Sequence, residues 1–255
     1  MLWYKAWLDT RWRFLIGLAL LTCGAATMVI IHDRVMELLP LVPNVQVSGE
    51  LGRRVRESAS LIGDYRGYVW AQWFRQTPTQ IGTLFAILLG TGGLLAQSSG
   101  GALLFTLSLP VSRTRLLSVR LAAGLGEWLL LALVPSLVIP LLSPAVGQSY
   151  GVGAAIAHSV CIFIAGAVFF SLAFFLSTCF SDMWRPLLLT VVIGVAISVV
   201  TEIIRELSPY SVFSVMSGER YFRTGQLPWL GLLASLAASS ALLWAAVVNT
   251  ARRDF

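Results

Sequence analysis

Long apolar runs, separated by short polar stretches, dominate the chain. A helix needs about 20 apolar residues to cross the hydrocarbon core of a bilayer, within a range of roughly 17–25. Because lipid gives the backbone no hydrogen-bond partner, spanning segments must be helices or a closed barrel, and unbroken runs favour helices over the alternating pattern of barrel strands. Six runs are long enough. They predict an all-α polytopic membrane protein with six transmembrane helices in one domain over 1–255, at 14–31, 81–97, 121–142, 151–180, 187–204 and 228–249.

Two of the predicted spans have features that bear on their shape. Pro135 and Pro140 lie in the third span, and proline removes a helix hydrogen bond, so we expect a kink or a split into a short re-entrant pair. The fourth span is the longest, with no charged residue from 144 to 181, so it either tilts or extends past the membrane edge.

The first residues of the chain combine charge with aromatic side chains. Lys5, Asp9 and Arg13 follow at intervals of four and form a charged stripe on a helix. Aromatic side chains beside cations favour the headgroup level of a membrane, and here they are supplied, with one leucine, by Trp3, Trp7, Leu8 and Trp12. We predict an interfacial helix over 1–13 that turns into the first span. The alternative is a first span with an aromatic start.

A sizeable polar segment lies between the first two predicted spans, over residues 32–80. It mixes charges of both signs with Leu, Val and Tyr, and it is too short for a secure core of its own. We expect an extracytoplasmic loop that either caps the outer mouth of a pathway or is simply solvated. An aromatic belt is expected to lead from it into the second span, formed by Tyr68, Trp70, Trp73 and Phe74.

Composition strengthens the membrane assignment. The chain is 57% hydrophobic and 12% charged, with a mean hydropathy of +0.80, whereas soluble domains carry roughly 25% charged residues. An ordinary soluble domain is therefore excluded. Cys23, Cys161 and Cys179 lie in or beside apolar runs without a C-x-x-C spacing, so we interpret them as small buried residues and predict neither a disulfide framework nor a metal site.

The distribution of basic residues indicates the orientation. An even number of spans places both termini on one side, and nine basic residues then lie on that side and nine on the other. Those on the side of the termini cluster at span ends, where the positive-inside rule gives them most weight, whereas four of the others lie mid-loop between 53 and 66. We predict a multi-pass protein of the inner (plasma) membrane with both termini in the cytoplasm.

Catalytic motifs are weak. A phosphate-binding loop of the form GxxxxGK[ST] is missing from the sequence, because its single lysine does not follow a glycine. The pentapeptide GQSYG at 147–151 matches the G-x-S-x-G pattern of hydrolases, but His158 lies nine residues after Ser149, about 13 Å along a helix. We interpret the pentapeptide as a turn between two spans. We expect no enzyme activity, no cofactor and no metal site in this chain.

Ionisable residues within or near the spans form two groups. Glu127 lies seven residues after Arg120, two helical turns along the same face, and this spacing predicts a pair near the cytoplasmic interface. Glu202 and Arg205 lie at the outer end of the fifth span, where the arginine can bridge neighbouring glutamates. A carboxylate at mid-bilayer costs about 2.5–3.5 kcal/mol on insertion scales, so these groups are either interfacial ion pairs or part of a polar path.

Residues 98–120 join the second and third predicted spans on the cytoplasmic side. Leucines on one helical face precede Pro110, which ends or bends the helix, and Arg113 and Arg115 follow at the membrane edge. Such a segment is either a short helix that docks into a groove of a partner protein or a basic loop on the membrane surface.

A family resemblance favours the first of these alternatives. The run GALLFTLSLPVSRTRLLSVR at 101–120 resembles the hallmark segment of the type-2 exporter permeases of the ATP-binding-cassette (ABC) transporters. The ending ARRDF and the aromatic-basic start are similar to that family as well, whereas the acidic residues common just before the segment are replaced here by uncharged ones. The matching residues are Gly101, Leu103, Leu107, Ser108, Leu109, Pro110, Val111, Ser112, Arg113, Leu116 and Arg120.

The resemblance implies the membrane subunit of an ATP-driven transporter. Residues 98–120 would then be its coupling helix, ATP and Mg would be bound by two copies of an ABC ATPase subunit, and a second permease chain would complete a homodimer or heterodimer. Contact with the ATPase subunit is expected from Gly101, Leu103, Leu107, Leu109, Pro110, Arg113 and Arg115.

The substrate and the alternatives rest on less specific features. Apolar and small residues in the spans suit a lipid-like, amphipathic or drug-like substrate, but they suit plain helix packing equally. The direction of transport, export, follows from the family resemblance alone.

Membrane lipid is an expected partner and nucleic acid is not. The alternatives are a stand-alone secondary transporter or channel, and a membrane enzyme that uses Ser149.

Overall fold

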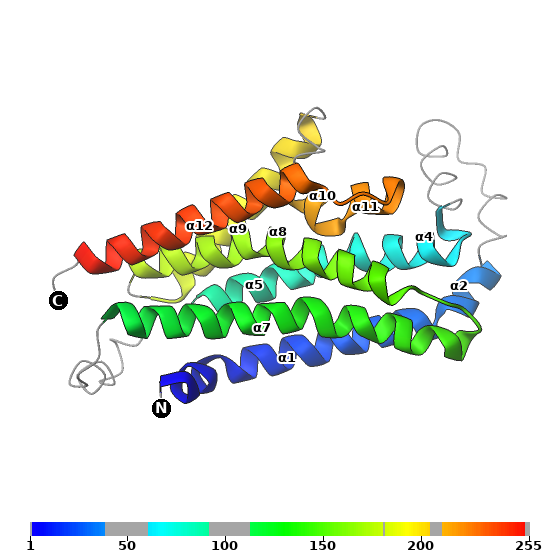
Figure 1. Cartoon of the computed structure of the whole chain (residues 1–255), viewed down its shortest axis with the longest axis horizontal. Helices are drawn as coiled ribbons and strands as arrows, with labels where there is room; N and C mark the ends of the chain where they lie inside the picture. Colours follow the sequence, from blue (N-terminus) through cyan, green and yellow to red (C-terminus); the bar gives the residue numbers. More distant parts are fainter. Residues whose placement is uncertain (1, 39–60, 92–112, 181, 205–210, 253–255) are drawn as a thin grey trace.

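The computed structural model describes residues 2–38, 61–91, 113–180, 182–204 and 211–252, which form helices joined by turns, with no strand among them. Five of the helices are long and apolar enough to cross a membrane. They run broadly along the long axis of the molecule (Figure 1) and are α1 (Leu2–Ile30), α7 (Arg113–Leu142), α8 (Val152–Cys179), α9 (Trp184–Ile203) and α12 (Trp229–Arg252). The all-α prediction is confirmed, and these helices fit a membrane protein.

The last three predicted spans agree closely with α8, α9 and α12, whose ends differ from the predicted ones by no more than three residues. The third predicted span lies within α7, which begins eight residues earlier and continues through both Pro135 and Pro140. The two prolines therefore do not split the segment into a re-entrant pair. Membrane helices tolerate internal prolines where neighbouring groups compensate the lost hydrogen bond.

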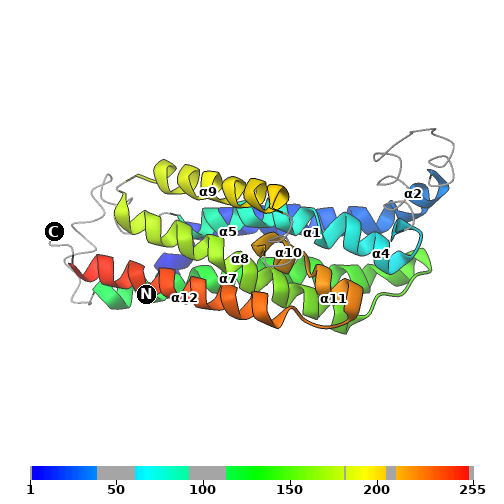
Figure 2. The same cartoon turned by 90° about the horizontal axis from the view of Figure 1, so that it is seen from above.

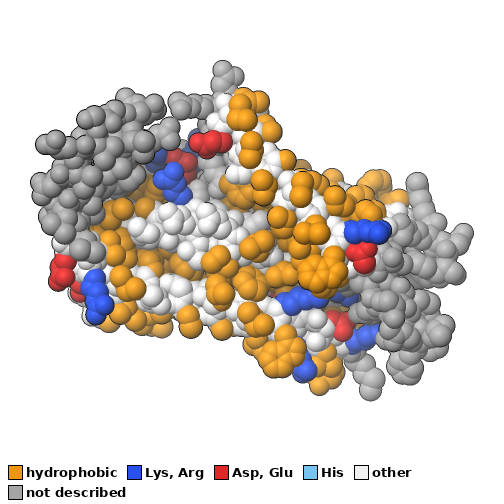
Figure 3. Space-filling view, turned by 180° about the vertical axis from the view of Figure 1, so that it is seen from behind, with side chains coloured by type: hydrophobic (Ala, Val, Ile, Leu, Met, Phe, Trp, Pro, Cys, Tyr) orange, Lys and Arg blue, Asp and Glu red, His pale blue; other side chains and the backbone are white. Residues whose placement is uncertain are grey.

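α8 is the central helix of the bundle. It lies between α9 and α12 in the view of Figure 2, and two-thirds of its most apolar stretch is buried, against one-third or less for the other four long helices. Figure 3 shows hydrophobic and uncharged side chains across the middle of one face, with most of the charged side chains toward the two ends. α8 thus forms a protein-covered core, while the outer helices present apolar side chains outward.

α1 is one continuous helix, where the sequence analysis predicted an interfacial helix followed by a separate span. Its buried residues recur every three or four positions on both sides of the predicted junction, so one face packs inward along its whole length. The residues of this face are Ala6, Thr10, Phe14, Gly17, Leu21, Ala25 and Val29. Packing of this face against α7 explains why the chain does not turn near residue 14.

A run of short helices replaces much of the predicted 32–80 loop. After α2 (His32–Leu38) and the undescribed residues, the chain is helical from 65 to 90 and lies beside α8 (Figure 1). The run consists of α4 (Tyr65–Val69), the π-helices η2 (Trp70–Phe74) and η3 (Pro78–Gly82), and α5 (Thr83–Gly90). Residues 81–90 of the predicted second span are helical, the helical run already begins at residue 65, and residues 92–97 lie outside the described part of the chain.

The expected aromatic belt lies in the core instead. Tyr68, Trp70, Trp73 and Phe74 are each no more than 2% exposed. The backbone N–H of Arg75 donates to the carbonyl of Trp70 at 2.9 Å, a π-type bond that adds one residue to the turn. Polar residues on the other side of this run interrupt its hydropathy, which is why the sequence analysis assigned it to a loop.

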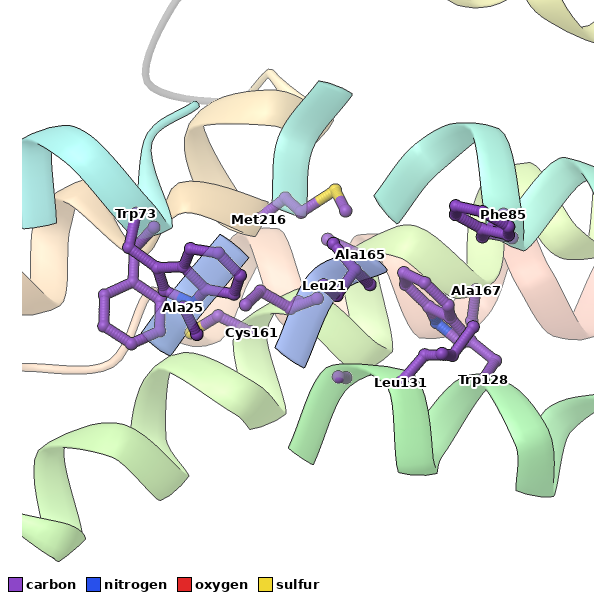
Figure 4. Packing of buried hydrophobic residues seen from close by; sticks show 14 of the residues in the cluster. Leu21, Ala25, Trp73, Phe85, Trp128, Leu131, Cys161, Ala165, Ala167 and Met216 are labelled. Atoms are coloured by element: carbon purple, nitrogen blue, oxygen red, sulfur yellow. The ribbon is translucent and has the colours of Figure 1, made fainter. Parts of the chain in front are cut away.

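Two tryptophans dominate the centre of the core. In Figure 4, Trp73 and Trp128 lie on either side of Leu21, Ala165 and Met216. The indole N–H of Trp128 donates to the carbonyl of Phe163 on α8 at 3.0 Å. Such a bond satisfies a donor that would otherwise be buried without a partner.

The described residues that precede α12, from 211 onward, pack against the bundle. α10 (Val212–Ser217) packs against α8, and α11 (Glu219–Thr224) follows after Gly218, whose φ of 64° is left-handed. The rings of Phe222 and Trp70 stack at 4.5 Å and tie α11 to η2. α1 begins and α12 finishes at the same end of the bundle, on the left in Figure 1.

Candidate functional site: a charge cluster between α1, α5 and α7

Charged side chains meet where the first halves of α1 and α7 pack together. The two helices run side by side in the same direction (Figure 1) and together carry six basic and two acidic residues, all in their first halves. We call the charged side chains that interact between the two helices, together with the Thr10 hydroxyl that bonds to one of them, the charge cluster. It consists of Asp9, Thr10, Arg13, Arg120 and Glu127.

Glu127 is the buried acid of the cluster, with 4% of its surface exposed. Its Oε1 accepts a hydrogen bond of 2.5 Å from Thr10 Oγ1. The hydroxyl also lies 3.1 Å from the carbonyl of Ala6, and the shorter distance identifies the carboxylate as its main acceptor. Oε2 has no hydrogen-bond partner among the described residues, but Arg13 and Arg120 act on the carboxylate electrostatically.

Arg13 connects α1 to the end of α5. Its Nη1 donates to the carbonyls of Leu88, at 2.9 Å, and of Thr91, at 3.3 Å. Its Nη2 lies 2.7 Å from Sδ of Met183, in the turn between α8 and α9. The last carbonyls of a helix lack intrahelical partners and carry partial negative charge, so a guanidinium stabilises them. Arg13 therefore holds three parts of the fold at the point where the chain leaves α5.

The structure places the predicted Glu127–Arg120 pair in one cluster, but the two side chains interact electrostatically without a described hydrogen bond. The sequence analysis missed Thr10, and it assigned Arg13 to a charged stripe at the membrane surface. The sequence did contain a signal for Thr10. It lies four residues from both Ala6 and Phe14, so it is a polar residue on an otherwise apolar helix face.

The predicted coupling residues are described only in part. Arg113 begins α7 and Arg115 is exposed in its first turn, so residues 113–120 belong to the helix of the third span rather than to a separate connection. Glu202 is exposed at the end of α9. The other predicted coupling residues, and Arg205 of the predicted pair with Glu202, lie outside the described part of the chain. The coupling residues concerned are Gly101, Leu103, Leu107, Leu109 and Pro110.

A second cluster, of aromatic rings around a histidine, lies nearer the other end of the bundle. His158 on α8 is 1% exposed, and its ring stacks on Phe74 at 4.1 Å and meets the edge of Tyr221 at 5.2 Å. Its Nδ1 lies 2.9 Å from the carbonyl of Ala154, so Nδ1 carries the hydrogen and Nε2 is an acceptor. Nε2 has no partner among the residues described.

The turn before α8 contains the pentapeptide that matched the hydrolase pattern. Ser149 is exposed there, and Gly147 has a left-handed φ of 66°, as tight turns require. His158 is buried and bonded through Nδ1 to its own helix, so no described interaction joins it to the serine. The geometry fits the predicted turn.

Within the described ranges, no group of three or more His, Cys, Asp and Glu side chains is arranged to hold a metal ion. Comparison with protein-family models, with curated proteins and with solved structures found no match to this chain. Function must therefore be argued from the residues themselves.

Proposed function

We propose that this chain is the membrane-spanning permease subunit of an ATP-driven ABC transporter of the type-2 exporter kind. The observation that carries the proposal is the run at 101–120, with its serine-leucine-proline-valine-serine-arginine centre. The sequence contains no phosphate-binding loop, so ATP and Mg would be bound by two copies of a separate ATPase subunit. A second permease chain would complete the transporter.

The arrangement of the helices supports this proposal. α5 ends and α7 begins toward the end of the bundle at which α1 begins and α12 finishes (Figure 1), so the described residues on either side of the coupling segment lie toward that end. The run from 65 to 90, counted as a pass across the membrane, brings the five long helices to six. With six passes both termini and the coupling segment face the cytoplasm, where the ATPase subunit would dock.

The charge cluster gives the coupling segment a mechanical connection to the bundle. A displacement of the segment pulls first on the end of α5, which Arg13 holds through the carbonyls of Leu88 and Thr91. Arg13 and Thr10 transmit the displacement to α1, and the Thr10–Glu127 hydrogen bond transmits it to α7. We infer that movement of the ATPase subunits reorients these helices and moves a lipid-like or amphipathic substrate outward across the inner membrane.

Two substitutions in the coupling segment test the proposal. Pro110→Ala and Arg113→Glu are expected to reduce co-purification with an ABC ATPase subunit and to reduce ATP-dependent transport in proteoliposomes. Arg34→Glu is the control, because Arg34 is exposed on α2 at the other end of the bundle. Unchanged assembly and transport in both variants would remove the coupling role. Transport by the chain alone in ATP-free vesicles would instead identify a stand-alone secondary transporter or channel.

A further inference from the structure

We propose that a cleft between the first turns of α1 and the start of α7 binds the phosphate headgroup of an anionic phospholipid. The cleft is open to the surface and combines charged with apolar side chains. It is lined by Leu2, Lys5, Ala6, Asp9, Leu116, Val119 and Arg120.

Charge favours an anion in this cleft. Lys5 reaches it from α1 and Arg120 from α7, against one acid, Asp9. The surrounding halves of the two helices carry six basic residues and two acidic ones, so basic residues outnumber acidic ones around the cleft. A positive field in a concave site concentrates anions.

Arg120 supplies a specific partner for a phosphate. Its guanidinium makes no hydrogen bond or ion pair to any residue that the structure describes; Asp9 and Glu127 attract it and Arg13 repels it at longer range. A guanidinium offers five N–H donors in a planar fork that fits phosphate oxygens in a bidentate manner. The headgroup phosphate would therefore give this guanidinium a direct partner, which none of the described residues provides.

The apolar lining distinguishes a lipid from a free anion. The rest of the wall is apolar, which suits the glycerol and the upper acyl carbons of a phospholipid, and consists of Leu2, Ala6, Leu116 and Val119. Trp3 and Trp12 are 59% and 65% exposed on the same stretch of α1. Tryptophan concentrates at the headgroup level of membranes, so this stretch lies where phospholipid headgroups are.

The experiment uses the full chain purified in a neutral detergent. Its melting temperature is followed during titration with short-chain phosphatidylglycerol, with phosphatidylcholine of the same chain length, and with glycerol phosphate. We expect the phosphatidylglycerol to raise the melting temperature saturably and the other two compounds to have little effect. Equal stabilisation by phosphatidylcholine, or by glycerol phosphate, would overturn the proposal.

Three variants locate the site. Arg120→Gln and Lys5→Gln remove a cation and are expected to weaken phosphatidylglycerol binding roughly tenfold or more each, since one hydrogen bond to a charged group contributes about 1.5–3 kcal/mol. Val119→Trp fills the cleft without changing charge, so it still decides the question if Arg120→Gln fails to fold. Arg34→Gln, exposed on α2, is the control. Wild-type affinity in the folded cleft variants would refute the site.

Discussion

Oγ1 of Thr10 on α1 lies 2.5 Å from Oε1 of Glu127 on α7, a contact between residues 117 positions apart in the chain. It is the only hydrogen bond to the buried Glu127 carboxylate among the described residues. Oε2, the other oxygen of that carboxylate, has no described partner. A carboxylate removed from water is costly unless it is hydrogen-bonded or paired. The packing of α1 on α7 at this level therefore depends on a single hydroxyl and on two neighbouring arginines.

Replacing Thr10 by valine tests this dependence. Thr10→Val keeps the shape of the side chain but removes the donor, and leaving the Glu127 oxygen unsatisfied is expected to cost about 1–3 kcal/mol in the free energy of unfolding. Chemical denaturation in detergent measures the change. Thr224→Val is the control, because the exposed Thr224 hydroxyl donates to the carbonyl of Arg220 at 2.7 Å, accepts from the backbone N–H of Gln226 at 3.3 Å, and bonds to no carboxylate. Equal losses in the two variants would contradict the special role of the buried bond.

Replacing Arg13 is expected to loosen the end of α5. Arg13→Met removes the donors to the carbonyls of Leu88 and Thr91 while keeping much of the apolar stem. Faster amide hydrogen exchange is then expected around residues 88–91, because helix ends fray when their carbonyls lose their partners. Arg11→Met, two residues earlier and exposed, should leave exchange at this site unchanged. Unaltered exchange in Arg13→Met would show that the guanidinium does not hold α5.

Two glycines of α8 form a matched pair for core packing. A Cβ on Gly166 would overlap the indole ring of Trp128, whereas a Cβ on Gly153 meets nothing within 4 Å. Gly166→Ala is therefore expected to destabilise the protein by about 1–3 kcal/mol through overpacking. Gly153→Ala is expected to be neutral or to stabilise by up to about 1 kcal/mol through helix propensity. Thermal unfolding in detergent compares them, and equal melting temperatures would contradict the close approach of α7 to α8.

Tyr150 gives the fold a sensitivity to high pH. Burial raises the pKa of its phenol, which lies in the turn before α8, and the hydroxyl has no partner among described residues. Because the folded-state pKa lies above the unfolded value of about 10, titration of Tyr150 leaves stability unchanged below that pH, and stability falls as the pH rises from there toward the folded-state pKa.

Tyr150→Phe is the corresponding variant. It removes both the ionisation and a buried hydroxyl, so we expect stability at neutral pH to be equal to or above that of the parent and to fall less steeply above pH about 10. Unfolding free energies measured from neutral to alkaline pH provide the comparison. Tyr4→Phe, at a tyrosine that is 68% exposed, is the control. Parallel pH profiles for parent and variant would rule out the titration of Tyr150 as the cause.

The agreement between sequence and structure differs from helix to helix for physical reasons. α8, α9 and α12 follow their predicted ranges closely because an unbroken apolar run of sufficient length is a local property. The helix from 65 to 90 was predicted only in its last third. Arg75 and Gln76 interrupt the hydropathy of this stretch. Its π-type turn directs the aromatic residues inward, and an average of hydropathy over a window of residues cannot predict such a turn.

The sequence by itself determined the helical membrane class, most of the long helices and the approach of Arg120 to Glu127, because these depend on apolar length and on helical periodicity. Only the tertiary structure decided that α1 is unbroken, that Arg13 turns toward α5 and that Thr10 reaches Glu127. Those relationships require helices far apart in the chain to pack at one register. Nothing within a single helix encodes which face of a distant helix it will meet.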